Sequence, residues 1–177
     1  MKNTTEPIKK QIEVSIQEYR NQYPNDEDSY IIEAEFLYYF TENATERREV
    51  VEQTLTRGIE NCKGFAFACS LRLAIEHYEH GELVEAEKFL LKCKNHITNT
   101  DDNADHGKVC YFYAMSMLSR YFKTKETMSI DEVVTIRELI EKEMLTIRRY
   151  DLIKPKLFDR FEKLVDIFTD EVENRIK

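Results

Sequence analysis

Two histidines in the segment HYEH are the first residues whose types and spacing could support metal chemistry. His77 and His80 stand three residues apart, so on one helix they lie within reach of a shared ion. The zincin pattern instead requires histidines at i and i+4 with a catalytic glutamate between them. We therefore expect no bound metal, but one histidine at a helix contact and the other at a helix end, where its cation interacts favourably with the macrodipole.

An acidic segment over residues 101–107 begins like a calcium-binding loop. Asp101, Asn103 and Asp105 alternate along the sequence DDNADHG, as calcium ligands do in that loop. However, His106 replaces the required glycine, and Phe112 stands where a bidentate glutamate should be. The segment is better interpreted as a solvated acidic turn that caps the following helix.

The remaining sequence offers no recognisable catalytic group. It contains no readable nucleophile–base pair, no glycine-rich loop that could cradle a phosphate and no paired carboxylates. We predict a protein that is not an enzyme and carries no cofactor. The net charge of −8 and the pI near 5.2 also argue against binding to nucleic acid, because phosphate contacts require clustered positive charge.

The composition favours a cytoplasmic location. The start of the chain, MKNTTEPIKKQIEV, holds no apolar run resembling a leader, and nowhere do eighteen apolar residues follow one another, so neither secretion nor membrane insertion is predicted. The cysteines form no C-x-x-C pair and lie in apolar helical context, which predicts reduced, buried thiols. They are Cys62, Cys69, Cys93 and Cys110.

Helices are the elements expected to position these residues. Glycine and proline together make only seven residues, about 4% where average usage is roughly 12%, which disfavours turn-rich β-structure. Thr5, Asn43 and Gly64 are placed as helix caps or stops. The prediction is an all-α fold with helices over 6–22, 29–40, 44–62, 65–80, 83–97, 107–123, 129–149 and from 155 onward.

A weak internal repeat suggests how the helices pack. Ala34, Ala74 and Ala114 recur at a spacing of forty residues, each in the first helix of a predicted hairpin, where a small side chain allows close approach. Hairpins that cannot bury their apolar stripes alone stack into a superhelix with a concave face. We expect one domain, 1–177, with N-terminal helices (6–64), a repeat region (65–123) and C-terminal capping helices (130–177).

The segment LRLAIEHYEHGELVEAEKFLLKC, residues 71–93, resembles a tetratricopeptide repeat. Glycine ends the first helix and a small residue lets the second pack against it, although His77 stands at the consensus tyrosine. The resemblance implies a right-handed superhelix of antiparallel hairpins. The matching residues are Leu73, Ala74, Gly81, Leu83, Glu85, Ala86, Leu90 and Cys93.

Residues 8–125 look like part of the tetratricopeptide-containing response-regulator aspartate phosphatases and their peptide-pheromone-sensing relatives in bacteria. The order of NDEDSYIIEAEFLYYF, a helix, the 71–93 hairpin and the acidic segment carries this resemblance. In the phosphatases a glutamine after an acidic run is catalytic, whereas this chain has Ser29 after Asp28. The resemblance therefore implies peptide binding, while Asp28 and Ser29 would contact a response regulator if that activity were retained.

Aromatic runs at 38–40 and 111–113 could line a ligand groove, because tyrosine combines contact area with a polar tip. Core packing is the alternative, and alternation of faces requires some of these rings to point away from the core. Tetratricopeptide-like grooves bind through their inner helices, which makes five residues the candidates for contact with a peptide or partner: Arg72, His77, Tyr78, Tyr113 and Met117.

Charge is distributed unevenly along the chain. Residues 23–46 hold seven acidic side chains and no lysine or arginine, whereas residues 142–163 hold seven basic and four acidic ones. The two segments could complement each other or another copy, the basic one could bind an acidic partner, or both could simply be solvated. The last helix carries a narrow apolar seam suited to capping or to homo-oligomerisation through 155–176.

These observations predict a non-catalytic, cytoplasmic helical-repeat protein that binds a short peptide or a signalling protein on a concave face. A phosphoaspartate phosphatase, or a sequestering inhibitor of a response regulator, is one alternative. A structural oligomerisation module is another. Neither nucleic acid nor membrane is an expected partner.

Overall fold

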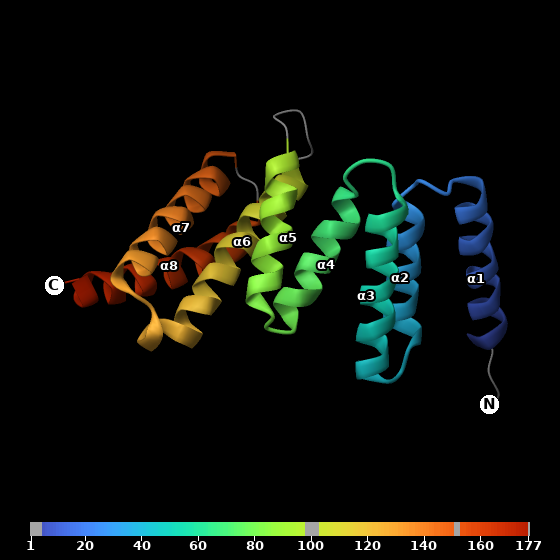
Figure 1. The fold of residues 1–177 in the computed structure, drawn as a ribbon, viewed down its shortest axis with the longest axis horizontal. Coiled ribbons are helices and arrows are strands. Elements are labelled where there is room, and N and C mark those ends of the chain that lie inside the picture. The colour runs from blue at the N-terminus through green and yellow to red at the C-terminus, as the bar shows by residue number, and fades with distance from the viewer. Residues whose placement is uncertain (1–4, 98–102, 151–152, 177) are drawn as a thin grey trace. The chain divides into compact units, whose positions relative to one another are not determined.

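The computed structural model describes residues 5–97, 103–150 and 153–176, and within these ranges the chain is all-α, without a strand (Figure 1). This confirms the predicted fold class. The helices are α1 (Thr5–Gln22), α2 (Asp28–Phe40), α3 (Ala44–Asn61), α4 (Phe67–Glu79), α5 (Leu83–His96), α6 (Asn103–Thr124), α7 (Ile130–Tyr150) and α8 (Pro155–Ile176), with a short 3₁₀ turn, η1 (Lys125–Thr127).

Local sequence sets most helix ends. The Asn43 side chain accepts hydrogen bonds from the backbone N–H groups of Thr45 and Glu46 at 2.9 and 3.0 Å, as expected of an N-cap. Ser129 and Glu132 form a reciprocal capping box at the start of α7, each side chain accepting from the other residue's backbone N–H. Gly81 has φ +76°, which lets the chain turn between α4 and α5.

The start of α6 differs from its prediction. The helix begins at Asn103 instead of 107, so Gly107 lies inside it and is buried. Glycine weakens a helix interior by about 1 kcal/mol relative to alanine, and the burial of Gly107, Val109 and Cys110 offsets that preference.

The chain forms two compact units, Met1–Leu73 and Ala74–Lys177, which divide within α4; each is described by itself. The expectation of one domain over 1–177 therefore stays a prediction. No helix in the described ranges is both long and apolar enough to cross a membrane.

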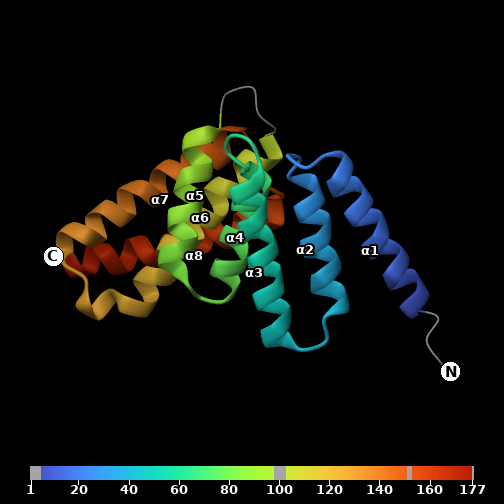
Figure 2. The ribbon, with the colours of Figure 1, turned by 45° about the vertical axis from the view of Figure 1, so that its right-hand side comes forward.

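In the first unit, α2 and α3 pack closely and lie side by side (Figures 1 and 2). Gly58 of α3 permits this approach, because a Cβ there would lie 2.6 Å from Cys69 Sγ and 2.9 Å from Tyr30 Cβ. Tyr30, Ala34, Val51 and Leu55 fill the space around it and are almost fully buried. Helix α1 lies on the opposite side of α2 from α3 (Figure 2) and packs less closely.

In the second unit, α6 packs closely against both α5 and α7. Helix α8 packs on α6 and α7 through its apolar seam, in which Phe161, Val165, Phe168 and Val172 are at most 3% exposed. Two ring pairs fix this contact: Tyr111 meets Phe161 edge to face at 5.8 Å, and Tyr121 meets Phe168 at 4.7 Å.

Two ion pairs of the second unit are buried or half-buried. Glu143 of α7 is fully buried and accepts a hydrogen bond from Lys94 of α5. Arg120 of α6 donates to both carboxylate oxygens of Glu87 at 2.7 and 3.0 Å, the two-pronged geometry that makes such pairs strong. These pairs tie α5 to α6 and α7.

The repeat expected from the alanine spacing is only partly visible. Ala34, Ala74 and Ala114 are at most 1% exposed, as helix contacts through small residues require. The closest helix pairs are α2–α3, α5–α6 and α6–α7, and within the second unit His77 of α4 stacks on Phe89 of α5 with ring centres 5.7 Å apart. Stacking of hairpins into a superhelix stays a prediction.

Candidate functional site

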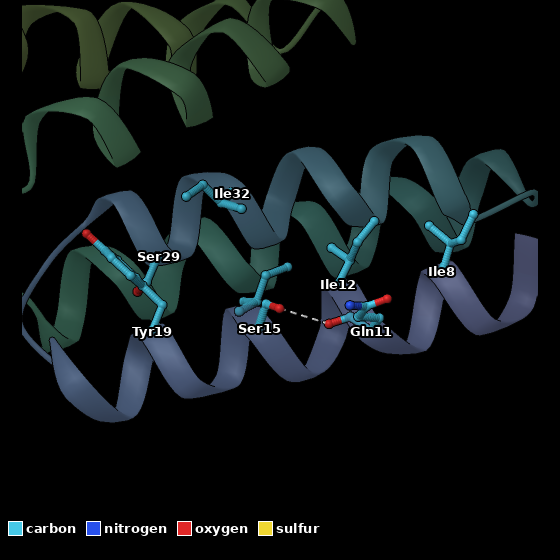
Figure 3. Close-up of a pocket in the computed structure, with 8 residues that line it drawn as sticks. Ile8, Gln11, Ile12, Ser15, Tyr19, Ser29 and Ile32 are labelled. Atoms are coloured by element: carbon cyan, nitrogen blue, oxygen red, sulfur yellow. Dashed lines mark hydrogen bonds between the residues drawn. The ribbon is translucent and has the colours of Figure 1, made fainter.

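The first unit contains an open cleft of about 420 Å³ between α1 and α2 (Figure 3). This volume falls within the range of about 300–1,000 Å³ found for ligand sites. Most of the lining comes from one face of α1, with two residues from α2. The residues are Ile8, Gln11, Ile12, Ser15, Ile16, Tyr19, Ser29 and Ile32.

The cleft is elongated along α1. Its lining recurs every three or four residues from Ile8 to Tyr19, so with a rise of 1.5 Å per residue it extends about 16 Å, or three helical turns. Ile8 and Ile32 are half exposed, at 55% and 50%, and Figure 3 shows Ile8 and Ile12 directed toward the gap beside α2. The cleft therefore presents a row of uncovered aliphatic side chains.

The hydroxyl groups in the cleft are already engaged. Ser15 Oγ donates to the Gln11 carbonyl at 3.0 Å, and Ser29 Oγ donates to the Asp26 carbonyl at 3.0 Å. Tyr19 donates its hydroxyl proton to Asp26 at 2.7 Å. This hydrogen bond raises the pKa of Tyr19 to about 12 and lowers the pKa of Asp26, so neither group is poised to exchange a proton near neutral pH.

Polar contacts at one end hold α1 to α2. Arg20 donates to Glu33 at 2.6 Å and to the Ser29 carbonyl at 3.3 Å, and its guanidinium lies 4.4 Å from the centre of the Tyr30 ring. By helical spacing Arg20 lies on the flank of α1 that carries the buried Ile16, away from the open side of the cleft. The contacts of Arg20 thus leave the aliphatic side chains of the cleft uncovered.

The outer face of α2 continues the cleft. Asp28, Ile32, Glu35 and Tyr39 are spaced by four, three and four residues, so they form one stripe. Tyr39 is 75% exposed and Ile32 half exposed, and Glu35 pairs with Arg72 at 3.1 Å while keeping 43% of its side chain exposed. We call these four residues the α2 stripe; it combines apolar and acidic side chains beside the cleft.

The predicted partner-binding residues are divided between the two units. Arg72 belongs to the first and is held by Glu35, with the Tyr38 ring 5.7 Å away. His77 and Tyr78 belong to the second: His77 Nδ1 lies 2.7 Å from Glu82 and Tyr78 meets Phe112 edge to face. All three are half-buried and engaged within their own unit.

Tyr113 and Met117 are core residues. They are 8% and 1% exposed, and burial raises the pKa of the Tyr113 hydroxyl. The prediction assigned them to a binding face because they lie on an expected inner helix, and an error of one residue in the face moves a side chain by about 100° around the axis. In this structure they offer almost no surface to a partner.

The acidic run before α2 is largely structural. Asp26 accepts a hydrogen bond from the Tyr19 hydroxyl. Glu27 accepts a hydrogen bond from the Cys69 backbone N–H at 3.2 Å, and this contact caps the start of α4. Burial raises the pKa of Glu27. Of the two residues predicted to contact a response regulator, Asp28 is exposed and Ser29 is 1% exposed, so only Asp28 is presented at the surface.

The two histidines considered for metal binding each have a different hydrogen-bond partner. His80 Nδ1 lies 2.8 Å from the Glu76 carbonyl, at the end of α4, while His77 is engaged by Glu82. The start of the acidic segment, including Asp101 and the side chain of Asn103, lies outside the described residues. Three of the four cysteines are buried; Cys62 is half-buried.

The apolar seam of α8 is occupied within its own unit, as the capping interpretation expects. Homo-oligomerisation through 155–176 stays a prediction, and it would have to use the outer side of α8, where Ile167 and Ile176 are about half exposed.

The sequence indicated the residues of the cleft without indicating the cleft itself. Ile8, Ile12, Ile16 and Tyr19 were recognisable as one apolar face, but only Ile16 is buried. The sequence signal that could have indicated the cleft is Ile32, an apolar residue on the side of α2 opposite the buried Ala34. Comparison of the chain with protein-family models, with curated proteins and with solved structures found no match.

Proposed function

We propose that the protein is a non-catalytic regulatory protein that binds a short amphipathic helix of a partner protein in the α1–α2 cleft. The supporting observation is the open, elongated row of aliphatic side chains in the cleft, whose hydroxyl groups are engaged internally. Such a surface can bury the apolar side chains of a partner, but it offers a substrate no general acid, general base or nucleophile.

The dimensions favour a helix over a small molecule. A cleft about 16 Å long matches the spacing of apolar side chains at i, i+3 or i+4, and i+7 on a docked helix. Its open side gives a helix lateral access, whereas compact ligands are usually bound in more enclosed cavities. Ile32 and Tyr39 on the α2 stripe extend the contact beyond the cleft.

We further propose that the hairpins belong to a tetratricopeptide-like, right-handed superhelix, and that Arg72, His77 and Tyr78 contribute to a concave binding face. The turn at Gly81 and the buried Ala74 and Ala86 support this. Signal transmission would then follow from a change in the tilt of the hairpins when a partner binds.

Selection from a displayed library of helical peptides with randomised surfaces tests the cleft without presupposing a partner. The selected peptides should share apolar residues at i, i+3 or i+4, and i+7, and they should bind the double variant Ile8→Asn/Ile32→Asn at least about tenfold more weakly. Val14→Asn is the matched control, because Val14 is 49% exposed on α1 and does not line the cleft. Peptides that bind the double variant and the wild type equally would refute the assignment.

The absence of catalysis is tested with a phosphorylated receiver domain. Adding the protein should leave the lifetime of the phosphoaspartate unchanged. Accelerated loss of phosphate that depends on Asp28 would instead establish the phosphatase alternative.

A further inference from the structure

We propose that the helix bound in the α1–α2 cleft is basic, with lysine or arginine side chains flanking its apolar stripe and pairing with acidic residues around the cleft. This inference rests on the proposed function and specifies the chemical class of the partner. It follows from the charges that surround the aliphatic row.

The charge of this part of the molecule is strongly negative. Between Thr5 and Phe40 the chain carries eight acidic and three basic side chains. Arg20, one of the three, is paired with Glu33. Lys10 lies by helical spacing on the face of α1 opposite the cleft, and Lys9 lies on the flank that carries Ile16 and Arg20. The field at the open side is therefore set by carboxylates.

Three acidic residues lie within one helical turn of residues that line the cleft. Asp28 and Glu35 precede and follow Ile32 by four and three residues on the α2 stripe, and Glu18 follows Ser15 by three on α1. Asp28 and Glu18 are exposed, and Glu35 is partly exposed. They lie on both helices that border the aliphatic row.

A basic amphipathic helix satisfies both features of this surface. Its apolar side chains would cover Ile8, Ile12 and Ile32, while cations at the edges of its apolar stripe would reach Asp28, Glu35 and Glu18. Such edge charges mainly accelerate association and select among partners, and their effect weakens as salt increases. An acidic helix of the same shape would be repelled.

The test uses two synthetic helices of about 18 residues, or five turns. They share leucines along one stripe and differ only in the polar face, which is lysine in one and glutamate in the other. We expect the lysine helix to bind at least about tenfold more tightly, with a dissociation constant that rises as sodium chloride is increased. Fluorescence anisotropy measures both quantities.

Site-directed variants separate local pairing from general attraction to an acidic protein. Replacing Asp28 and Glu35 together, as Asp28→Asn/Glu35→Gln, should weaken the lysine helix about threefold to tenfold, since exposed pairs contribute modestly. The matched control, Glu49→Gln/Glu60→Gln, removes two exposed charges of α3 in the same unit and should have little effect.

The outcomes separate this inference from the proposed function. Equal binding of both helices, sensitive to Ile8→Asn/Ile32→Asn, would retain the cleft and overturn the basic partner. If both pairs of charge substitutions weaken the lysine helix equally, the attraction is general and the inference is also overturned. Binding of neither helix, together with dimerisation of the protein that Ile8→Asn/Ile32→Asn abolishes, would identify a second copy as the occupant and overturn both proposals.

Discussion

Each of the two units of this protein contains an amphipathic helix, but the apolar face of that helix is buried in one unit and partly exposed in the other. In the second unit, the apolar seam of α8 is at most 3% exposed at Phe161, Val165, Phe168 and Val172. In the first, the apolar face of α1 buries Ile16 but leaves Ile8 55% exposed. The same periodicity therefore completes a core in one place and leaves an exposed apolar surface in the other.

Polar contacts reinforce the difference. The second unit buries ion pairs between helices distant in sequence, such as Lys94 with Glu143. The first unit holds α1 through Arg20 and Tyr19, both near its C-terminal end. The polar contacts of α1 therefore lie at one end of the helix, while Ile8 at the other end stays exposed.

The largest expected effect on stability comes from removing an aromatic ring from the core of the second unit. Phe168→Ala should lower the free energy of unfolding by about 3–5 kcal/mol, because it leaves a cavity beside Tyr121. Ile32→Ala, at a half-exposed site, should change it by no more than about 0.5 kcal/mol. Urea denaturation followed by circular dichroism compares the two. Equal effects would remove the distinction between closed and open apolar faces.

Breaking the buried ion pair should have the next largest effect. Lys94→Met leaves the carboxylate of Glu143, which is 0% exposed, without its cation, and we expect a loss of about 3 kcal/mol. The double variant Lys94→Met/Glu143→Leu should recover most of this, because two apolar side chains replace both charges. A double variant no more stable than Lys94→Met in urea denaturation would show that Lys94 matters only for packing.

Within the first unit, Gly58→Ala tests where packing is tight. The new Cβ would lie 2.6 Å from Cys69 Sγ and 2.9 Å from Tyr30 Cβ, and overpacking costs about 1–3 kcal/mol. The gain in helix propensity is about 1 kcal/mol, so the net loss should not exceed about 2 kcal/mol. Adding Cys69→Ala should make the Gly58→Ala step less costly, as a thermodynamic cycle would show. Strictly additive effects would contradict this contact.

The smallest expected effect is a pH dependence at the turn between α1 and α2. The hydrogen bond from Tyr19 lowers the pKa of Asp26 and raises that of Tyr19 to about 12. Its stabilisation should therefore be complete between about pH 4 and pH 10. It should be lost as the pH falls through the folded-state pKa of Asp26, and as it rises through about 12.

Nuclear magnetic resonance can follow this turn through the chemical shifts of α1 between pH 7 and pH 3. The acid-induced change should be smaller in Tyr19→Phe, which cannot donate the hydrogen bond. Val14→Ala, at an exposed position of α1 that carries no ionisable group, should show the same acid-induced change as the wild type. The same acid-induced change in Tyr19→Phe and the wild type would show that the hydrogen bond does not stabilise the turn.

Helix positions were largely predictable because their signals are local. Asn43, Gly81 and Pro155 each act on their own turn, and the helices begin or end within about two residues of them. The exception is α6, which begins at Asn103, four residues before the buried Gly107. A local propensity of about 1 kcal/mol cannot anticipate such tertiary compensation.

The candidate site was less predictable, because a helical pattern gives the apolar face but not what covers it. Tyr113 and Met117 were assigned to a groove and are in the core, whereas Ile8 and Ile32, which were not assigned to a binding site, are half exposed. The role of Glu27 at the start of α4 depends on Cys69, 42 residues away. No periodicity within one helix contains that information.

The sequence alone determined that the chain is helical, where most of its helices begin and end, and which side of each is apolar, because these properties depend on neighbours within a few residues. Only the tertiary structure decided which apolar sides are covered. Lys94 and Glu143 meet across 49 residues, and Ile8 and Ile32 border one cleft from separate helices. Burial depends on the position of distant chain segments, so it was decided when the helices packed.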